Sequence, residues 1–108
     1  MTLHADDRVL LLAIPSIADT AAIARVLIKG VVVALGSRDE VDRARAALAE
    51  FDNIMFIEAW PDRIPWRDQY FTKILVPPRM EPALRSIGAE LQRVLAPEGQ
   101  IIRQTVDA

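Results

Sequence analysis

The sequence contains no cysteine, which excludes disulfide bonds, thiolate zinc sites and cysteine nucleophiles. It contains no apolar run long enough to span a bilayer, and its first residues, MTLHADDR, lack the pattern of a signal peptide. The net charge of −2 provides no broad attraction to nucleic acid or to an anionic membrane. We therefore expect a cytoplasmic protein that binds neither nucleic acid nor membranes.

The sequence also offers no pattern of residues typical of acid–base catalysis or metal binding. The only histidine, His4, lies near the N-terminus, where chains commonly fray. Asp62 and Asp68 are close in sequence, but spacing within a loop defines no geometry for catalysis. Ser16 and Ser37 have no histidine partner, and helix capping explains both. We expect no catalytic residue and no metal site.

The composition fits one domain that covers residues 1–108. A chain of this length buries roughly two-thirds of the surface that it exposes when unfolded, which is enough for a single core. The chain is 52% hydrophobic and 26% charged, with a mean hydropathy of +0.19. This combination indicates either a sheet buried on both faces or an apolar surface that a partner covers.

The hydrophobic pattern alternates between buried strands and amphipathic helices. Continuous apolar runs such as RVLLLAI are typical of strands covered on both faces. Five strands are expected, at Arg8–Ile14, Val31–Leu35, Ile54–Ile57, Tyr70–Val76 and Gln100–Val106. Right-handed crossovers between them predict an α/β fold, a Rossmann-like, doubly wound parallel sheet of about five strands with helices on both faces. We expect the strand order 3-2-1-4-5.

Three helices are expected between these strands. The first covers Ile17–Lys29, with Ser16 as its N-cap. The second begins at Ser37, because Ser37 and Glu40 have the spacing of a capping box. The third has Pro82 in its first turn and ends before a turn at Pro97–Gly99. The connection between the third and fourth strands is too short and too rich in proline for a full helix.

Several segments, in this order, resemble the class I S-adenosylmethionine-dependent methyltransferases. Residues 31–45, VVVALGSRDEVDRAR, are similar to the second strand and helix of that family. The segments NIMFI, IPW and YF, between residues 53 and 71, resemble its third and fourth strands, and residues 90–99, ELQRVLAPEG, resemble its segment LxRVLxPGG. The likeness runs through nearly the whole chain in one register and implies the same fold.

The chain departs from the family where the methyl donor would bind. The family's glycine-rich turn after the first strand is replaced here by a turn with Ile14 and Ser16, and Pro15 removes an N–H. An acidic residue that takes the ribose hydroxyls is replaced by Leu35, and an aspartate near the adenine by Trp60. Each lost polar contact would weaken binding by roughly 1–3 kcal/mol. We therefore expect no cofactor, with S-adenosylmethionine bound only if the pocket is retained.

The resemblance also bears on assembly. The family core continues beyond the fifth strand, whereas only Asp107 and Ala108 follow that strand here, so the resemblance implies a truncated, degenerate member. An open edge strand tends to recruit another chain. This predicts a homodimer or a complex with a protein partner.

Four residues are candidates for a cleft at the carboxyl ends of the strands. Trp60 either forms an aromatic platform for a planar ligand or fills the space of the adenine and closes the cleft; we favour the second interpretation. Trp66 is expected in the core or in the cleft wall. Pro77 and Arg79 belong to the segment VPPR. This segment has neither the polar first residue nor the aromatic last residue of the (D/N)PP(Y/F) motif of amine methyltransferases, so it indicates a loop before a helix.

Three arginines, Arg63, Arg67 and Arg79, would form an anion site if they converged at the open end of the sheet. Acidic neighbours in the same segments, Asp62, Asp68 and Glu81, favour instead a solvated rim of mixed charge.

These features favour a degenerate methyltransferase-like domain that does not catalyse methyl transfer and that acts as an interaction or assembly module. One alternative is an active methyltransferase with an atypical cofactor pocket or with partner-dependent activity. A second alternative is a protein that binds another small molecule in the remodelled cleft.

Overall fold

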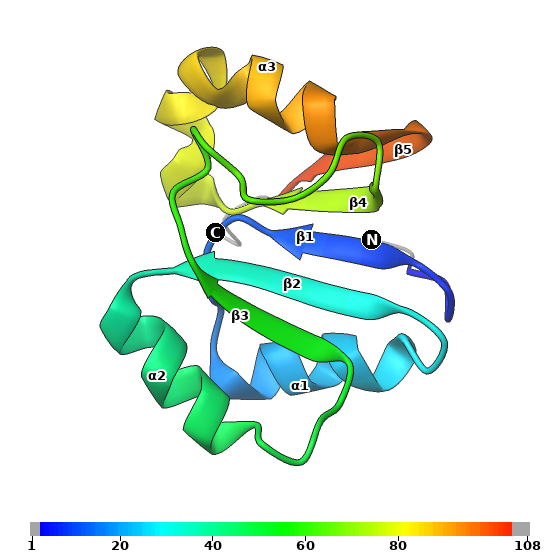
Figure 1. The fold of residues 1–108 in the computed structure, drawn as a ribbon, viewed down its shortest axis with the longest axis vertical. Coiled ribbons are helices and arrows are strands. Elements are labelled where there is room, and N and C mark those ends of the chain that lie inside the picture. Colours follow the sequence, from blue (N-terminus) through cyan, green and yellow to red (C-terminus); the bar gives the residue numbers. More distant parts are fainter. Residues whose placement is uncertain (1–2, 105–108) are drawn as a thin grey trace.

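The sheet at the centre of the structure is entirely parallel. The computed structural model describes residues 3–104, and its strands are β1 (Arg8–Leu11), β2 (Val31–Gly36), β3 (Ile54–Glu58), β4 (Phe71–Val76) and β5 (Leu95–Arg103). The strand order is β3-β2-β1-β4-β5, and all neighbouring strands are parallel (Figure 1). The predicted Rossmann-like α/β fold and its strand order are confirmed.

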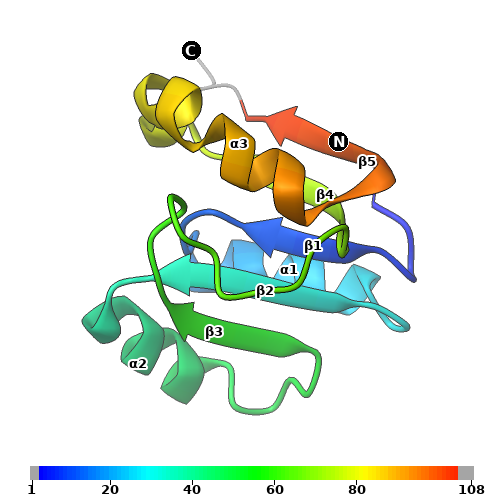
Figure 2. The same ribbon diagram turned by 45° about the horizontal axis from the view of Figure 1, so that its top comes forward.

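Helices cover both faces of this sheet. The helices are α1 (Ile17–Val26), α2 (Arg38–Ala47) and α3 (Leu84–Val94), and a 3₁₀ segment, η1 (Pro78–Ala83), precedes α3. Figures 1 and 2 show α1 and α2 on one face and α3 on the other. Within residues 3–104, no helix is long and apolar enough to cross a membrane.

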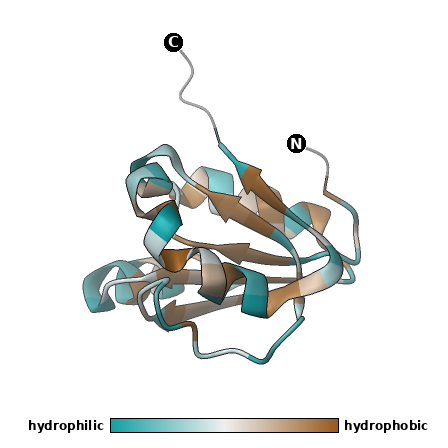
Figure 3. Ribbon diagram, turned by 90° about the horizontal axis from the view of Figure 1, so that it is seen from above, coloured by the Kyte–Doolittle hydropathy of each residue, from teal (hydrophilic) through white to brown (hydrophobic). Residues whose placement is uncertain are grey.

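Two hydrophobic cores result, one on each face of the sheet. The first joins α1 and α2 to the sheet through buried residues that include Ala24, Val41, Val9, Val32 and Phe56. The second joins α3 and the β3–β4 loop to the other face through residues that include Ile87, Leu91, Ile64, Leu10 and Phe71. Figure 3 shows the apolar strands between helices whose outer sides are hydrophilic. The high mean hydropathy thus reflects, in large part, a sheet covered on both faces.

The two predicted helix caps are present. The Ser16 hydroxyl accepts a hydrogen bond from the Asp19 backbone N–H at 3.1 Å. Ser37 and Glu40 form the reciprocal capping box, with distances of 2.9 and 3.3 Å. The α1 helix ends at Val26 rather than at Lys29, because the Lys29 N–H bonds to the Ala5 carbonyl and leads the chain away into β2.

The predicted boundaries are wrong at three other places. The β1 strand ends at Leu11, since the following residues turn towards α1. Pro82 lies inside η1 instead of the first turn of α3. The expected turn at Pro97–Gly99 is instead an irregularity within β5. Phe71 of β4 pairs with Leu95 of β5, and the next pair is Lys73 with Gln100, so β5 contains extra residues between these two pairs. Thr105 and Val106, predicted as strand residues, lie outside the described part of the chain.

Candidate functional site

Two hollows lie at the carboxyl ends of the strands, beside the turn between β1 and α1. Such crevices are where open α/β sheets usually bind ligands. The first hollow has a volume of about 520 Å³ and the second about 260 Å³. Ala13 and Arg79 line both, so the hollows adjoin each other.

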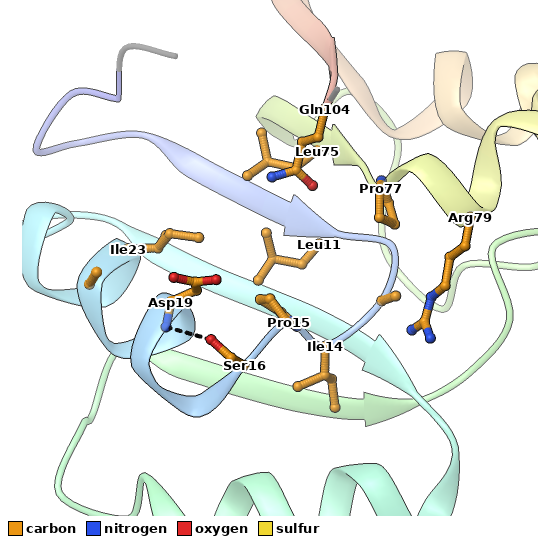
Figure 4. A pocket seen from close by; sticks show the side chains of 12 residues that line it. Leu11, Ile14, Pro15, Ser16, Asp19, Ile23, Leu75, Pro77, Arg79 and Gln104 are labelled. Carbon is orange, nitrogen blue, oxygen red and sulfur yellow. Dashed lines mark hydrogen bonds between the residues drawn. The ribbon is translucent and has the colours of Figure 1, made fainter. Parts of the chain in front are cut away.

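The first hollow lies between α1 and the strands β1 and β4. Asp19 and Ile23 of α1 line it together with Leu11 and Leu75 of the two strands (Figure 4). Four predicted site residues, Ile14, Ser16, Pro77 and Arg79, border the same hollow. The Ser16 hydroxyl already caps α1, so it is engaged by the fold.

The second hollow has an apolar floor and a polar rim. Leu12 and Leu35 form part of the floor and are 2% and 0% exposed. Ala59 and Met80 add further apolar surface. Trp60, Arg79, Ser37 and Glu40 also line it. The structure thus brings three of the predicted residues, Leu35, Trp60 and Arg79, together at one place.

The turn after β1 presents a side chain where a glycine-rich turn would present backbone. A Cβ atom placed on Gly36 would lie 2.8 Å from the Cδ1 atom of Ile14. The Ile14 side chain therefore packs directly over the end of β2, and a side chain at position 36 would require Ile14 to move. Pro15 provides no N–H donor next to it.

Trp60 does not fill the cleft from inside, and that expectation is corrected. Trp60 is 72% exposed and lies at the mouth of the second hollow. The Ala59 N–H pairs with Gly36 at the end of β3, and the Trp60 carbonyl accepts from Arg63 in a turn that leads the chain away from the sheet. Ile64, further along the loop, provides the buried apolar side chain instead.

Trp66 is partly buried and packs against the core instead of lining the cleft. Its ring centroid lies 5.5 Å from that of Tyr70 and 5.8 Å from that of Phe71. These aromatic residues lie around the start of β4, at the opposite end of that strand from Pro77 and Arg79. Trp66 lines neither of the two hollows.

Arg63, Arg67 and Arg79 do not converge to form an anion site. Arg67 lies over the Tyr70 ring, 4.6 Å from its centroid, before β4 begins. Arg79 follows the other end of β4, roughly 20 Å away for a six-residue strand. The nearest acidic partner of Arg79 is Glu40, with 4.0 Å between Nη2 and Oε2. Hydrogen bonds from the Ser37 backbone and hydroxyl, and more weakly the charge of Arg79, lower the pKa of Glu40, which is ionised at neutral pH.

The sequence analysis did not predict the ion pair of Arg93 and Glu90 on α3, which holds the β3–β4 loop in place. Arg93 of α3 donates to the carbonyls of Ile64 and Trp66 at 2.8 and 2.9 Å, and to the carboxylates of Glu90 and Asp68. Glu90 also accepts from the Ile64 N–H at 2.6 Å. The side chain of Arg93 lowers the pKa of Glu90 to about 2, against the opposing effect of burial. The i,i+3 spacing of Glu90 and Arg93 in the segment ELQR could have predicted their ion pair. This spacing does not indicate that Arg93 also binds carbonyl groups of the loop.

The site as a whole suits an apolar ligand with a small number of polar contacts. Its floor is apolar, one wall is an exposed indole, and its cation is a single guanidinium. In residues 3–104, no group of three histidine, aspartate or glutamate side chains is placed to hold a metal ion.

No protein-family model matches this sequence, and no curated protein matches it. Solved structures do match its fold. An S-adenosylmethionine-dependent methyltransferase from Aquifex aeolicus is similar over 87% of this chain and 53% of its own, with 20% identity and a TM-score of 0.74. The YcgJ protein of Bacillus subtilis is similar over 93% of this chain and 44% of its own, with 20% identity and a TM-score of 0.78.

A candidate methyltransferase from Bacillus halodurans is similar over 94% of this chain, with 22% identity and a TM-score of 0.78. This chain covers 45% of that structure and thus spans about half the length of the proteins that it matches. Identities this low demonstrate the fold alone. The chain has the fold of the class I S-adenosylmethionine-dependent methyltransferases, as the sequence resemblance implies.

Proposed function

We propose that this chain is a methyltransferase-like domain that does not itself transfer methyl groups and that acts as an interaction or assembly module. One observation carries the proposal: Ile14 packs over Gly36 at the position where this fold would otherwise hold its cofactor against backbone. A cofactor carboxylate or ribose there would meet an apolar side chain without donors.

The second strand supports the same proposal. Leu35, at the position of the family's ribose-binding acid, is completely buried and has no polar atom in its side chain. Losing several polar contacts at roughly 1–3 kcal/mol each would remove most of the binding free energy of a micromolar ligand, which is about 8 kcal/mol.

An apolar edge of the molecule supports the interaction role. A shallow hollow of about 420 Å³ follows α2 and β3. Leu48, Phe51, Ile54 and Met55 line it together with the charged side chain of Arg45. Met55 is 46% exposed. Apolar surface grouped around a sheet edge is typical of protein contacts. The partner is a second copy of the chain or another protein.

Calorimetric and thermal-shift titration with S-adenosylmethionine and S-adenosylhomocysteine, up to about 1 mM, tests the absence of a cofactor site. A ligand at 100 times its dissociation constant would stabilise the fold by about 2.7 kcal/mol. We expect neither heat nor a shift. A clear shift contradicts the proposal and favours the active methyltransferase, which an isotope-labelled methyl-transfer assay would then examine.

Analytical ultracentrifugation over a wide range of protein concentration tests self-assembly. Pulldown with the purified chain tests for another protein partner. A monomer at all concentrations, with no protein retained in the pulldown, contradicts the interaction role.

A second candidate function is the binding of a different small molecule in the cleft. The observation that favours it is Trp60, which is exposed beside an apolar hollow instead of packed into it. Ligand retained in the native mass spectrum of the purified protein would support this function.

A further inference from the structure

We propose that the second hollow binds a small planar aromatic carboxylate, with the ring against Trp60 and the carboxylate on Arg79. This inference rests on the second candidate function above and specifies its ligand class. Three properties of the hollow carry it: an exposed indole over an apolar floor, an arginine with donors to spare, and a limited volume.

The indole and the floor favour a planar ring. Trp60 is 72% exposed and lines the hollow, so a ligand ring can contact its face without moving any core residue. Leu12 and Leu35 below it are nearly or fully buried, which makes the floor rigid and apolar. The thioether of Met80 adds a soft, adaptable wall for an aromatic ring. Aromatic rings gain more from such contacts than aliphatic groups of equal area.

Arg79 favours a carboxylate on that ring. Its side chain is 62% exposed, and its Nη2 atom lies 4.0 Å from the Glu40 carboxylate, beyond hydrogen-bonding distance. Among residues 3–104, the guanidinium of Arg79 makes no ion pair closer than this one. A guanidinium presents a planar fork that binds a carboxylate with two parallel hydrogen bonds. The ligand carboxylate would thus take the donors that Glu40 does not reach.

Glu40 sets a limit on the ligand. One of its oxygens accepts from the Ser37 N–H in the capping box, which holds the carboxylate in place on the rim. A second anionic group on the ligand would meet this fixed negative charge. A monoanion therefore fits better than a phosphate or a dicarboxylate.

The volume limits the ligand to one or two rings. The hollow holds about 260 Å³, slightly less than the roughly 300–1,000 Å³ of sites for drug-sized ligands. A nucleoside joined to an amino acid would have to extend into the adjoining first hollow, past Ala13 and Ile14.

Isothermal titration with 2-naphthoate, and with its neutral analogue 2-naphthamide, tests the inference. We expect 2-naphthoate to bind the unmodified chain at least about tenfold more tightly than the amide. Trp60→Ala and Arg79→Gln should each weaken binding of 2-naphthoate about tenfold. In the Arg79→Gln variant, the acid and the amide should bind alike. Arg85→Gln, a change at an exposed arginine on α3 that lines neither hollow, should have no effect.

Glu40→Gln provides the sharpest variant. Glutamine keeps the capping box, so the helix start is preserved while the negative charge is removed. Binding of 2-naphthoate should tighten several-fold in this variant, and binding of the amide should not change.

Equal affinity for acid and amide, no heat with 2-naphthoate, or unchanged binding in Trp60→Ala would overturn the inference. Adenosine serves as a further probe of the same hollow. Binding of adenosine but not of 2-naphthoate would overturn the ligand class while leaving a ligand-binding cleft intact. Binding of S-adenosylmethionine would instead contradict the proposal of a domain without methyl transfer.

Discussion

The two ends of the parallel sheet differ in how their polar groups are used. At the amino-terminal end, Asp7 is 5% exposed and accepts hydrogen bonds from the His4 N–H at 2.7 Å and from the Thr72 hydroxyl at 2.7 Å. Lys73, also buried, lies 3.4 Å from the same carboxylate. At the carboxyl end, the ion pairs of the described residues lie on the surface: Arg79 and Glu40 are separated by 4.0 Å, and Arg103 pairs with Glu81.

The contrast indicates which end stabilises the fold and which end is available for binding. A buried charge is tolerated only where partners surround it, and partners surround Asp7. Exposed pairs contribute little to stability. The exposed side chains on the rim, such as Trp60 and Arg79, are therefore expected to contribute little to stability, in contrast to the buried floor of Leu12 and Leu35.

The largest effect should follow from removing the buried carboxylate. Asp7→Ala leaves Lys73 buried without its carboxylate partner, which typically costs about 3–5 kcal/mol of unfolding free energy. Urea denaturation measures the change. Asp62→Ala, at an exposed position in the β3–β4 loop, should change stability by less than about 0.5 kcal/mol. A loss below about 1 kcal/mol for Asp7→Ala would remove the contrast between the two ends.

Releasing the β3–β4 loop should have the next largest effect. Arg93→Ala removes hydrogen bonds to two loop carbonyls and leaves Glu90 without its cation. We expect a loss of about 3 kcal/mol, because hydrogen bonds to charged groups are worth more than neutral ones. Hydrogen exchange should accelerate at the Ile64 and Trp66 amides. Arg85→Ala on the same helix is the matched control. Equal losses of unfolding free energy in the two variants would argue against a specific role of Arg93 in holding the β3–β4 loop.

The same pair should make stability depend on pH in acid. Arg93 lowers the pKa of Glu90 from 4.5 to about 2 in the folded protein, so the folded state binds its proton less readily than the unfolded chain. The stabilisation is present above pH 4.5 and is lost as the pH falls towards 2. Glu90→Gln should destabilise the protein by about 1.5 kcal/mol at pH 7 and hardly at all near pH 2. Urea midpoints at both values measure this, and a constant difference would contradict it.

The smallest effect should come from the exposed tryptophan. Because Trp60 is 72% exposed, Trp60→Ala should change the unfolding free energy by less than about 0.5 kcal/mol. A buried tryptophan replaced by alanine costs about 3–5 kcal/mol. A loss of that size would mean that the indole packs into the cleft in solution. It would also remove the aromatic platform on which the proposed ligand site depends.

Local patterns predicted most of the fold. The apolar runs located all five strands, and the capping signals at Ser16 and Ser37 located two helix starts. These signals act within a few residues, so they are visible in the sequence. The ends of elements were less predictable, because contacts from elsewhere decide them. The Lys29 N–H leaves α1 for a carbonyl at Ala5, which no local pattern indicates.

The candidate site was predicted in part. Ile14, Leu35 and Arg79 border the hollows, as expected for residues at or just beyond the carboxyl ends of parallel strands. The two tryptophans could not be told apart, since one loop carries both and their residue type is the same. The contacts of Trp66 with Tyr70 and Phe71 draw it into the core, while the turn after Ala59 leaves Trp60 outside.

The sequence by itself determined the class of fold and the strand order, because hydrophobic periodicity and chirality leave few ways to bury five strands. Only the tertiary structure decided which side chains meet: Ile14 over Gly36, Arg93 on the carbonyls of the loop, and Arg79 between two hollows. These contacts join residues far apart in the chain. Their geometry arises from the packing of the whole sheet, and local sequence does not encode it.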